Sequence, residues 1–227
     1  GVYTADPRIV PNARKMEEVT YDEMLEMASL GAKVLHSRCV EIAKKYGVEL
    51  LVCSSLNRNS GTMVREKTKM EKMLISGVAA DKNVAKIRVA GLGNDPESTF
   101  RLLNLLDRNN LNIDVMIQSL GKDGTKSVSF TVAKPDMLRT IDVLNDNKDS
   151  LGIKKLDYDE NVAKISVIGA GVRSHSGVAA KMFGALANAG INTEMITTSE
   201  IRITALIDEA YADQAMRAIH ETFLERV

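Results

Sequence analysis

The sequence predicts an α+β fold in which two copies of one small module follow a segment of different, α/β character. The clearest observation is an internal repeat, because Asn-Val-Ala-Lys-Ile at 83–87 recurs at 161–165. Each copy continues through apolar residues to a Gly-x-Gly sequence, at 91–93 and at 169–171. A recurring segment of this kind indicates one structural unit used twice, here with a length of about 75–80 residues.

The first copy predicts a complete module. Apolar and charged residues alternate over 85–89, which is typical of a strand with one solvent-facing side. An apolar stripe at helical spacing follows over 100–106. The remaining expected elements are strands over 113–117 and 127–132 joined by an Asp-Gly turn, a helix over 136–145 and a strand over 153–158. This order, β-α-β-β-α-β, is that of a ferredoxin-like fold.

The second copy predicts the same order but lacks a last strand. Its expected elements are strands over 162–168, 192–198 and 200–207, with helices over 177–189 and 209–223. An unassigned apolar strand over 73–80 precedes the first copy, and we expect it to complete the second module. The predicted domains are therefore residues 1–70, an inserted module over 82–158, and a second module made of 71–81 with 159–227.

The first seventy residues predict two helices and a strand. Thr20 is the expected N-cap of a helix over 21–30, with Glu23 as its capping-box partner. A second helix is expected over 34–46 and closes at Gly47, before a strand over 49–54. Because so few elements bury too little surface to fold alone, this segment is interpreted as the end of a larger α/β domain.

Composition excludes several classes of protein. Thirty Lys and Arg residues balance thirty Asp and Glu residues in the 227-residue chain. A nucleic-acid binder or a polybasic membrane-surface protein normally carries a basic excess. No apolar run approaches the ~18 residues of a membrane span. With 44% hydrophobic residues, the chain is predicted to be a globular cytoplasmic protein that binds neither nucleic acid nor membrane.

Cysteine and histidine spacing predicts no metal centre. Cys39 and Cys53 fit no zinc-site pattern and are expected to be buried, reduced thiols. His36, His175 and His220 lie far apart and are expected to be solvated or to cap helices.

The Gly-x-Gly loops are the first candidate sites. A dinucleotide fingerprint needs a third glycine where Pro96 and Ser174 stand, so dinucleotide binding is not expected. A glycine loop before a helix N-terminus still presents free N–H groups that suit a small carboxylate such as that of an amino acid. The alternative is a tight turn without a ligand, and the residues alone leave both interpretations open.

Polar residues on the following strand could complete such a site. Asn112, Asp114 and Gln118 could hold a zwitterion, with its ammonium at Asp114 and its carboxylate at the helix. The alternative is a strand-end Asn turn beside an exposed Asp. The residues therefore indicate a pair of small-molecule-sensing modules attached to the tail of another domain.

Several motifs together resemble the aspartokinase family over essentially the whole chain. Gly-Val-Tyr-Thr-Ala-Asp-Pro-Arg-Ile-Val-Pro at 1–11 is similar to a segment near the end of the family's catalytic domain. The doubled module resembles the family's tandem ACT domains, notably at 112–114, 174–178 and 198–202. The resemblance implies an amino-acid kinase tail followed by two ferredoxin-like ACT modules.

The resemblance also assigns site residues. In relatives the Tyr-Thr-x-Asp-Pro-Arg stretch contacts the nucleotide, which implies nucleotide-binding roles for Tyr3, Thr4, Ala5, Asp6, Pro7, Arg8 and Lys33. Effector-binding positions are implied at Asn94, Asp95, Pro96, Glu97, Ser98, Thr99, Asn112, Ile113, Asp114 and Gln118 in the first module. In the second module they are implied at Asn192, Thr193, Ser199 and Glu200. No catalytic residue and no metal ligand is expected.

The family phosphorylates L-aspartate from ATP with Mg²⁺, and its ACT pair binds lysine, threonine or both as feedback effectors. The resemblance thus implies that this chain is the regulatory part of an aspartokinase, with no cofactor of its own. The alternative is a separate regulatory subunit or assembly module that pairs with a catalytic chain. A homodimer through the first module is expected, since ACT modules commonly pair edge to edge.

The sequence departs from the family pattern at a few positions. Asn94 stands where many relatives have Asp, Glu97 where they have Gly, and Ser176 where Pro is usual. The family's N-terminal catalytic half is absent, so the chain is expected to be inactive alone, with Gly1 interpreted as a cut within a nucleotide-binding segment.

Overall fold

The computed structural model describes residues 1–31, 34–56, 60–68 and 75–225. The chain divides into two compact units: unit 1 comprises residues 1–82 and 163–227, and unit 2 comprises residues 83–162. Strands β4 (Gly77–Leu92) and β7 (Lys155–Ile168) each contribute residues to both units. The predicted α+β class, with ferredoxin-like modules after an α/β segment, is confirmed.

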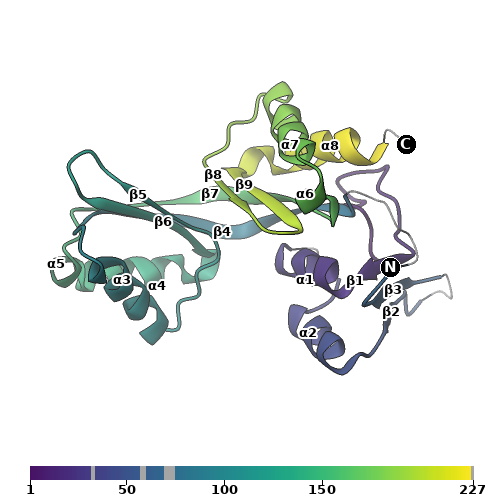
Figure 1. Cartoon of the computed structure of the whole chain (residues 1–227), viewed down its shortest axis with the longest axis horizontal. Coiled ribbons are helices and arrows are strands. Elements are labelled where there is room, and N and C mark those ends of the chain that lie inside the picture. Colours follow the sequence, from purple (N-terminus) through teal and green to yellow (C-terminus); the bar gives the residue numbers. More distant parts are fainter. Residues whose placement is uncertain (32–33, 57–59, 69–74, 226–227) are drawn as a thin grey trace. The chain divides into compact units, whose positions relative to one another are not determined.

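Unit 2 is a four-stranded sheet with helices on one side (Figure 1). Its strand order is β5-β6-β4-β7, and β6 pairs antiparallel with both β4 and β5. Besides β4 and β7, its elements are α3 (Glu97–Arg108), β5 (Met116–Leu120), β6 (Lys126–Ala133), a 3₁₀ turn (Lys134–Asp136), α4 (Met137–Asp146) and α5 (Lys148–Leu151). Alternate residues of β4 and β6 join Leu102 and Leu106 of α3 in one buried cluster.

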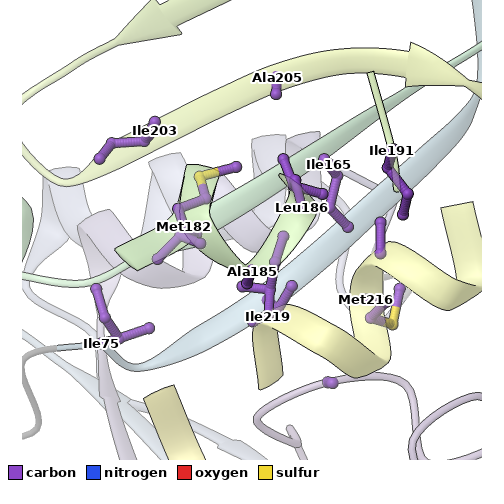
Figure 2. Close-up of a cluster of buried hydrophobic side chains, with 14 of the residues drawn as sticks. Ile75, Ile165, Met182, Ala185, Leu186, Ile191, Ile203, Ala205, Met216 and Ile219 are labelled. Carbon is purple, nitrogen blue, oxygen red and sulfur yellow. The ribbon is translucent and has the colours of Figure 1, made fainter. Parts of the chain in front are cut away.

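The second module of unit 1 repeats this arrangement with the strand order β4-β7-β9-β8. Its further elements are α6 (Gly171–Ser174), α7 (Gly177–Asn188), β8 (Met195–Thr198), β9 (Arg202–Asp208), a 3₁₀ turn (Glu209–Tyr211), α8 (Ala212–His220) and a π-helical turn (Glu221–Glu225). Figure 2 shows Ile165 of β7, Ile203 of β9, Met182 of α7 and Ile219 of α8 in one hydrophobic cluster. The helices α7 and α8 therefore cover one face of this sheet.

The first segment of unit 1 forms a small sheet with two helices. Its elements are β1 (Glu18–Thr20), α1 (Tyr21–Ser29), α2 (Ser37–Tyr46), β2 (Leu50–Val52) and β3 (Thr62–Arg65). The strand order is β1-β3-β2, with β1 parallel and β2 antiparallel to β3. Met24 and Met27 of α1 share a buried cluster with Ala79 of β4 and Ile168 of β7, so α1 packs against the second module's sheet.

The strands predicted on either side of residues 81–84 form one continuous strand, β4, and those predicted on either side of 159–161 form one continuous strand, β7. The predicted breaks are therefore wrong. Polar residues there resemble a turn in sequence, but they remain extended within β4 and β7. Within β4 the Asp81 carboxylate pairs with Lys164 Nζ of β7 at 3.2 Å, and Lys82 pairs with Asp213 at 2.8 Å. Residues 73–74 of the predicted strand over 73–80 lie outside the described residues.

Cys39 and Cys53 are both free, as predicted, but both are exposed, so the prediction that they are buried is wrong. His36 does cap α2, accepting a hydrogen bond from the Arg38 N–H, and His175 is exposed. His220 departs from the prediction, since it is fully buried. Within the described residues, no helix combines the length and apolar character that a membrane span requires.

Candidate functional site

The segment expected to contact the nucleotide is divided between core and surface. Thr4 and Ala5 are buried, and Ala5 belongs to the hydrophobic cluster of the second module. The Thr4 hydroxyl lies 2.9 Å from His220 Nε2 and also accepts a hydrogen bond from the Arg14 N–H at 3.0 Å. The Thr4 carbonyl accepts a bond from the Val78 N–H of β4 at 2.8 Å. These two residues therefore anchor the segment rather than face solvent.

The accessible groups of this segment are Tyr3, Asp6, Pro7 and Arg8. The Arg8 guanidinium donates to the Asp6 carboxylate from Nη2 to Oδ2 at 2.6 Å and from Nε to Oδ1 at 3.0 Å and Oδ2 at 3.2 Å. These bonds hold the pKa of Asp6 below its ordinary value of 3.8, although partial burial opposes the shift. The outcome is an oriented, exposed guanidinium. Lys33 lies outside the described residues.

The loop before α3 is the second group of predicted residues. Gly91, near the end of β4, has a φ of +88°, and a Cβ there would meet the Lys154 side chain at 2.5 Å, which explains the glycine. Asp95 Oδ1 accepts the Glu97 N–H at 3.0 Å, and Ser98 Oγ donates to the Gly93 carbonyl at 2.6 Å. The side chains of the loop thus satisfy donors and acceptors around the helix start, while Asn94, Pro96 and Glu97 are exposed.

Two contacts tie the start of α3 to the neighbouring strands. Thr99 Oγ1 donates to Gln118 Oε1 of β5 at 2.6 Å, which brings two predicted residues together. Lys126, the first residue of β6, donates from Nζ to the Asp95 carbonyl at 2.7 Å. Sequence reasoning missed Lys126, because no local pattern links a residue at a hairpin to a loop thirty residues earlier. Its ammonium places a positive charge beside the helix N-terminus, which favours an anionic group there.

Asn112, Ile113 and Asp114 lie at the other end of β5. The Asp114 N–H donates to the Thr131 carbonyl, whereas Gln118 pairs with Val128. Gln118 lies four positions after Asp114, or roughly 13 Å along an extended chain. The structure therefore does not bring the Asp114 carboxylate to the α3 N-terminus of the same chain. Ile113 packs against the hydrophobic cluster of unit 2, while Asn112 and Asp114 are exposed.

The second module shows the same separation. Asn192 and Thr193 precede β8, in the position that Asn112 and Ile113 hold before β5. Ser199 and Glu200 lie in the hairpin at the other end of β8, where the Ser199 N–H donates to the Arg202 carbonyl at 2.8 Å. Glu200 pairs with Arg173 of α6 at 3.1 Å, and both side chains are exposed. The hairpin therefore lies beside the second Gly-x-Gly loop.

Both modules thus offer an exposed loop, a helix start and polar groups before and after an edge strand. Among the described residues, no group of three or more His, Cys, Asp or Glu side chains is arranged to hold a metal ion.

Comparison with known proteins supports this description. Residues 1–54 match the model of the amino acid kinase family, and residues 165–223 match the model of an ACT domain. The aspartokinase of Pseudomonas aeruginosa is 42% identical over 226 residues, covering 98% of this chain and 55% of that protein. The chain spans about half the length of the curated relatives it matches.

Two solved structures are similar in sequence and fold. The regulatory subunit of aspartate kinase from Thermus thermophilus, in its ligand-free form, is 33% identical, with a TM-score of 0.63 over 66% of this chain and 99% of that one. Aspartokinase III of E. coli, in complex with lysine and aspartate in the T-state, is 26% identical. Its TM-score is 0.80 over 99% of this chain and 50% of that one.

Proposed function

Because this chain belongs to the aspartokinase family, we propose that it senses lysine, threonine or both and so controls the ATP-dependent phosphorylation of L-aspartate. Residues 1–70 are assigned to the end of the kinase domain, 82–158 to the first ACT domain, and 71–81 with 159–227 to the second. On this proposal the whole kinase uses ATP with Mg²⁺, and this chain is inactive alone.

The observation that carries the proposal is the repeated loop–helix–strand arrangement with exposed polar groups. In unit 2 the start of α3 is linked to β5 by Thr99 and Gln118, and Lys126 adds a positive charge beside it. In unit 1 the loop around α6 lies beside the Ser199–Glu200 hairpin. A helix N-terminus with a nearby cation favours a carboxylate, and an exposed Asp favours an ammonium. An amino acid carries both groups.

The separation of Asp114 from the α3 N-terminus supports an effector site between two copies of the chain. β5 lies at the edge of its sheet among the described strands, and all five of its residues are exposed. Antiparallel pairing of β5 with a second copy, about a two-fold axis beside Met116, sets Gln118 of one copy opposite Asp114 of the other. One amino acid could then be held by both groups.

The same strand supports a homodimer through the first module. Met116, Ile117 and Leu120 are partly exposed apolar residues on an edge strand. An exposed apolar edge is a template for pairing with another strand. Light scattering at micromolar concentration is expected to give twice the mass of the 24.8 kDa chain, and a monomer would contradict the pairing.

The accessible part of the first segment suits a nucleotide phosphate. Arg8 is exposed, and the Asp6 carboxylate holds its guanidinium in a defined orientation. A planar guanidinium is well matched to phosphate oxygens. Tyr3, Pro7 and Arg8 are the residues of this segment that we propose to face ATP in the whole kinase.

Calorimetric titration of the 227-residue chain with lysine and with threonine tests the proposal. Saturable heat is expected with at least one of them. Asp114→Asn is expected to weaken that binding by about tenfold or more, which is the loss expected when a hydrogen-bonded charge is removed. The control Asp149→Asn, at an exposed position of α5, is expected to leave the binding unchanged. Absence of heat with both ligands refutes the sensing role.

A separate regulatory subunit is the second candidate function. The solved regulatory subunit from Thermus thermophilus is 99% covered by this chain, so the two modules can be the whole of such a protein. Mixing this chain with a catalytic aspartokinase chain and sizing the product distinguishes the candidates. A stable mixed complex supports a subunit, and two unchanged species support a regulatory region that acts only within its own chain.

A further inference from the structure

The structure joins the first segment to the second module through buried contacts that the proposed function does not use. Ala5 and Val10 belong to the same hydrophobic cluster as Ile219 of α8 and Met182 of α7. Arg14 Nη2 also donates to the Leu224 carbonyl at 2.6 Å, just beyond α8. The chain between Thr4 and Arg14 is therefore packed as part of the second module.

The central polar contact of this interface is the pair formed by Thr4 and His220. His220 is the last residue of α8 and is fully buried, and its Nε2 lies 2.9 Å from the Thr4 hydroxyl. The same hydroxyl accepts the Arg14 N–H, and the Thr4 carbonyl accepts the Val78 N–H of β4. A displacement of α8 against β4 must therefore move Thr4 or break one of these bonds. Breaking the Thr4–His220 contact costs free energy because both of its side chains are buried.

We propose that His220 is a positioning residue that couples the second ACT module to the segment over Tyr3–Arg8. His220 acts through Thr4, which lies two residues before Asp6. Asp6 in turn orients the Arg8 guanidinium. This coupling rests on the proposed function, and it names the element through which effector binding in the second module reaches the nucleotide segment. A ligand can act through this coupling only if it binds one position of α8 more tightly than another.

Amide hydrogen exchange of the full chain without ligand tests the coupling directly. The reporters are the Thr4 N–H, which donates to the Arg14 carbonyl, and the Ile9 and Val10 N–H groups, which both donate to the Asp6 carbonyl. His220→Leu is expected to raise their exchange rates about tenfold, as expected for the loss of one buried hydrogen bond. His220→Gln keeps a side-chain amide that can reach the Thr4 hydroxyl, and it is expected to restore most of the protection.

Two controls separate coupling from general destabilisation. His175→Leu makes the same substitution at an exposed site of the same module and is expected to change none of the reporters. Ala205 in β9 reports on the rest of unit 1. The inference is overturned if His220→Leu leaves the segment unchanged, if it accelerates Ala205 as much as Thr4, or if His220→Gln fails to restore protection.

A second arm adds lysine or threonine and keeps the two proposals distinguishable. With a ligand that gives heat, the native chain is expected to change exchange at Ile9 and Val10, and His220→Leu is expected to keep the heat but lose that change. Retention of the change in His220→Leu overturns the coupling. Absence of heat refutes the sensing role instead, and the ligand-free arm then decides the coupling alone.

Discussion

The ion pair between Glu26 and Arg202 is predicted to stabilise the packing of α1 against the second module. Arg202 Nη1 lies 2.9 Å from Glu26 Oε2, and the two side chains are only 18% and 24% exposed. At an effective dielectric constant near 20, two unit charges about 4 Å apart attract by about 4 kcal/mol. Because both side chains keep some contact with solvent, screening weakens this attraction, and we expect a pairwise coupling energy of about 2 kcal/mol.

A double-mutant cycle measures that coupling energy. The variants are Glu26→Gln, Arg202→Met and their combination, and native-state hydrogen exchange at Ala205 of β9 reports the free energy of opening unit 1. Phe130 of β6 is the internal reference, because it lies in the hydrophobic cluster of unit 2 and should not respond.

A matched control is provided by Arg173 and Glu200. This pair has a similar distance, 3.1 Å, but its side chains are 72% and 75% exposed. Solvent screening reduces the expected coupling to below about 0.5 kcal/mol for Arg173→Met with Glu200→Gln. Equal coupling energies for the two pairs would refute the argument that burial makes the Glu26 pair stronger.

Three further predictions concern the edge strand, the acid response and the unit 2 core. Ile117→Lys on β5 is expected to convert the homodimer to a monomer in light scattering, whereas Ile196→Lys on β8 keeps it; a dimer in both refutes pairing through β5. Asp6→Asn is expected to be less stable than the native chain at neutral pH, because the folded pKa lies below the ordinary 3.8. That difference shrinks as the pH falls through the folded pKa in acid unfolding, and a difference independent of pH contradicts it. Leu102→Ala is expected to cost unit 2 about 3 kcal/mol at its slowest-exchanging amides and to leave unit 1 amides unchanged.

Local signals predicted the elements that depend on neighbouring residues. The capping box of Thr20 and Glu23 is present in α1, and Gly47 closes α2 in the left-handed conformation. The internal repeat predicted the two modules, because each copy carries its own strand–loop–helix pattern. These features are decided within a few residues of chain, so the sequence alone suffices.

Features that depend on distant partners were not predicted. β1 and β3 are too short to show periodicity and exist because they pair across more than forty residues. Within β4, the partner of Asp81 is Lys164 on the neighbouring strand β7. Burial of His220 likewise depends on Thr4 at the other end of the chain. Each partner is visible only once the fold is known.

The candidate site was predicted as a set of residues, but its geometry was not. The loop before α3 and Gln118 do meet, through Thr99. Asp114 precedes the first residue of β5, because the connection from α3 enters the strand there, whereas Gln118 lies in the middle of the strand. Residue patterns identify which side chains are polar, whereas strand direction decides which of them converge.

The central claim is that this chain senses an amino acid through its ACT modules. The most direct test is calorimetric titration of the 227-residue chain and of Ile117→Lys with lysine and with threonine. We predict saturable heat with at least one ligand for the native chain, and its loss in the variant, because the site needs Gln118 and Asp114 from two copies. No saturable heat from either ligand contradicts the sensing role, and undiminished binding by a monomeric variant contradicts the shared site.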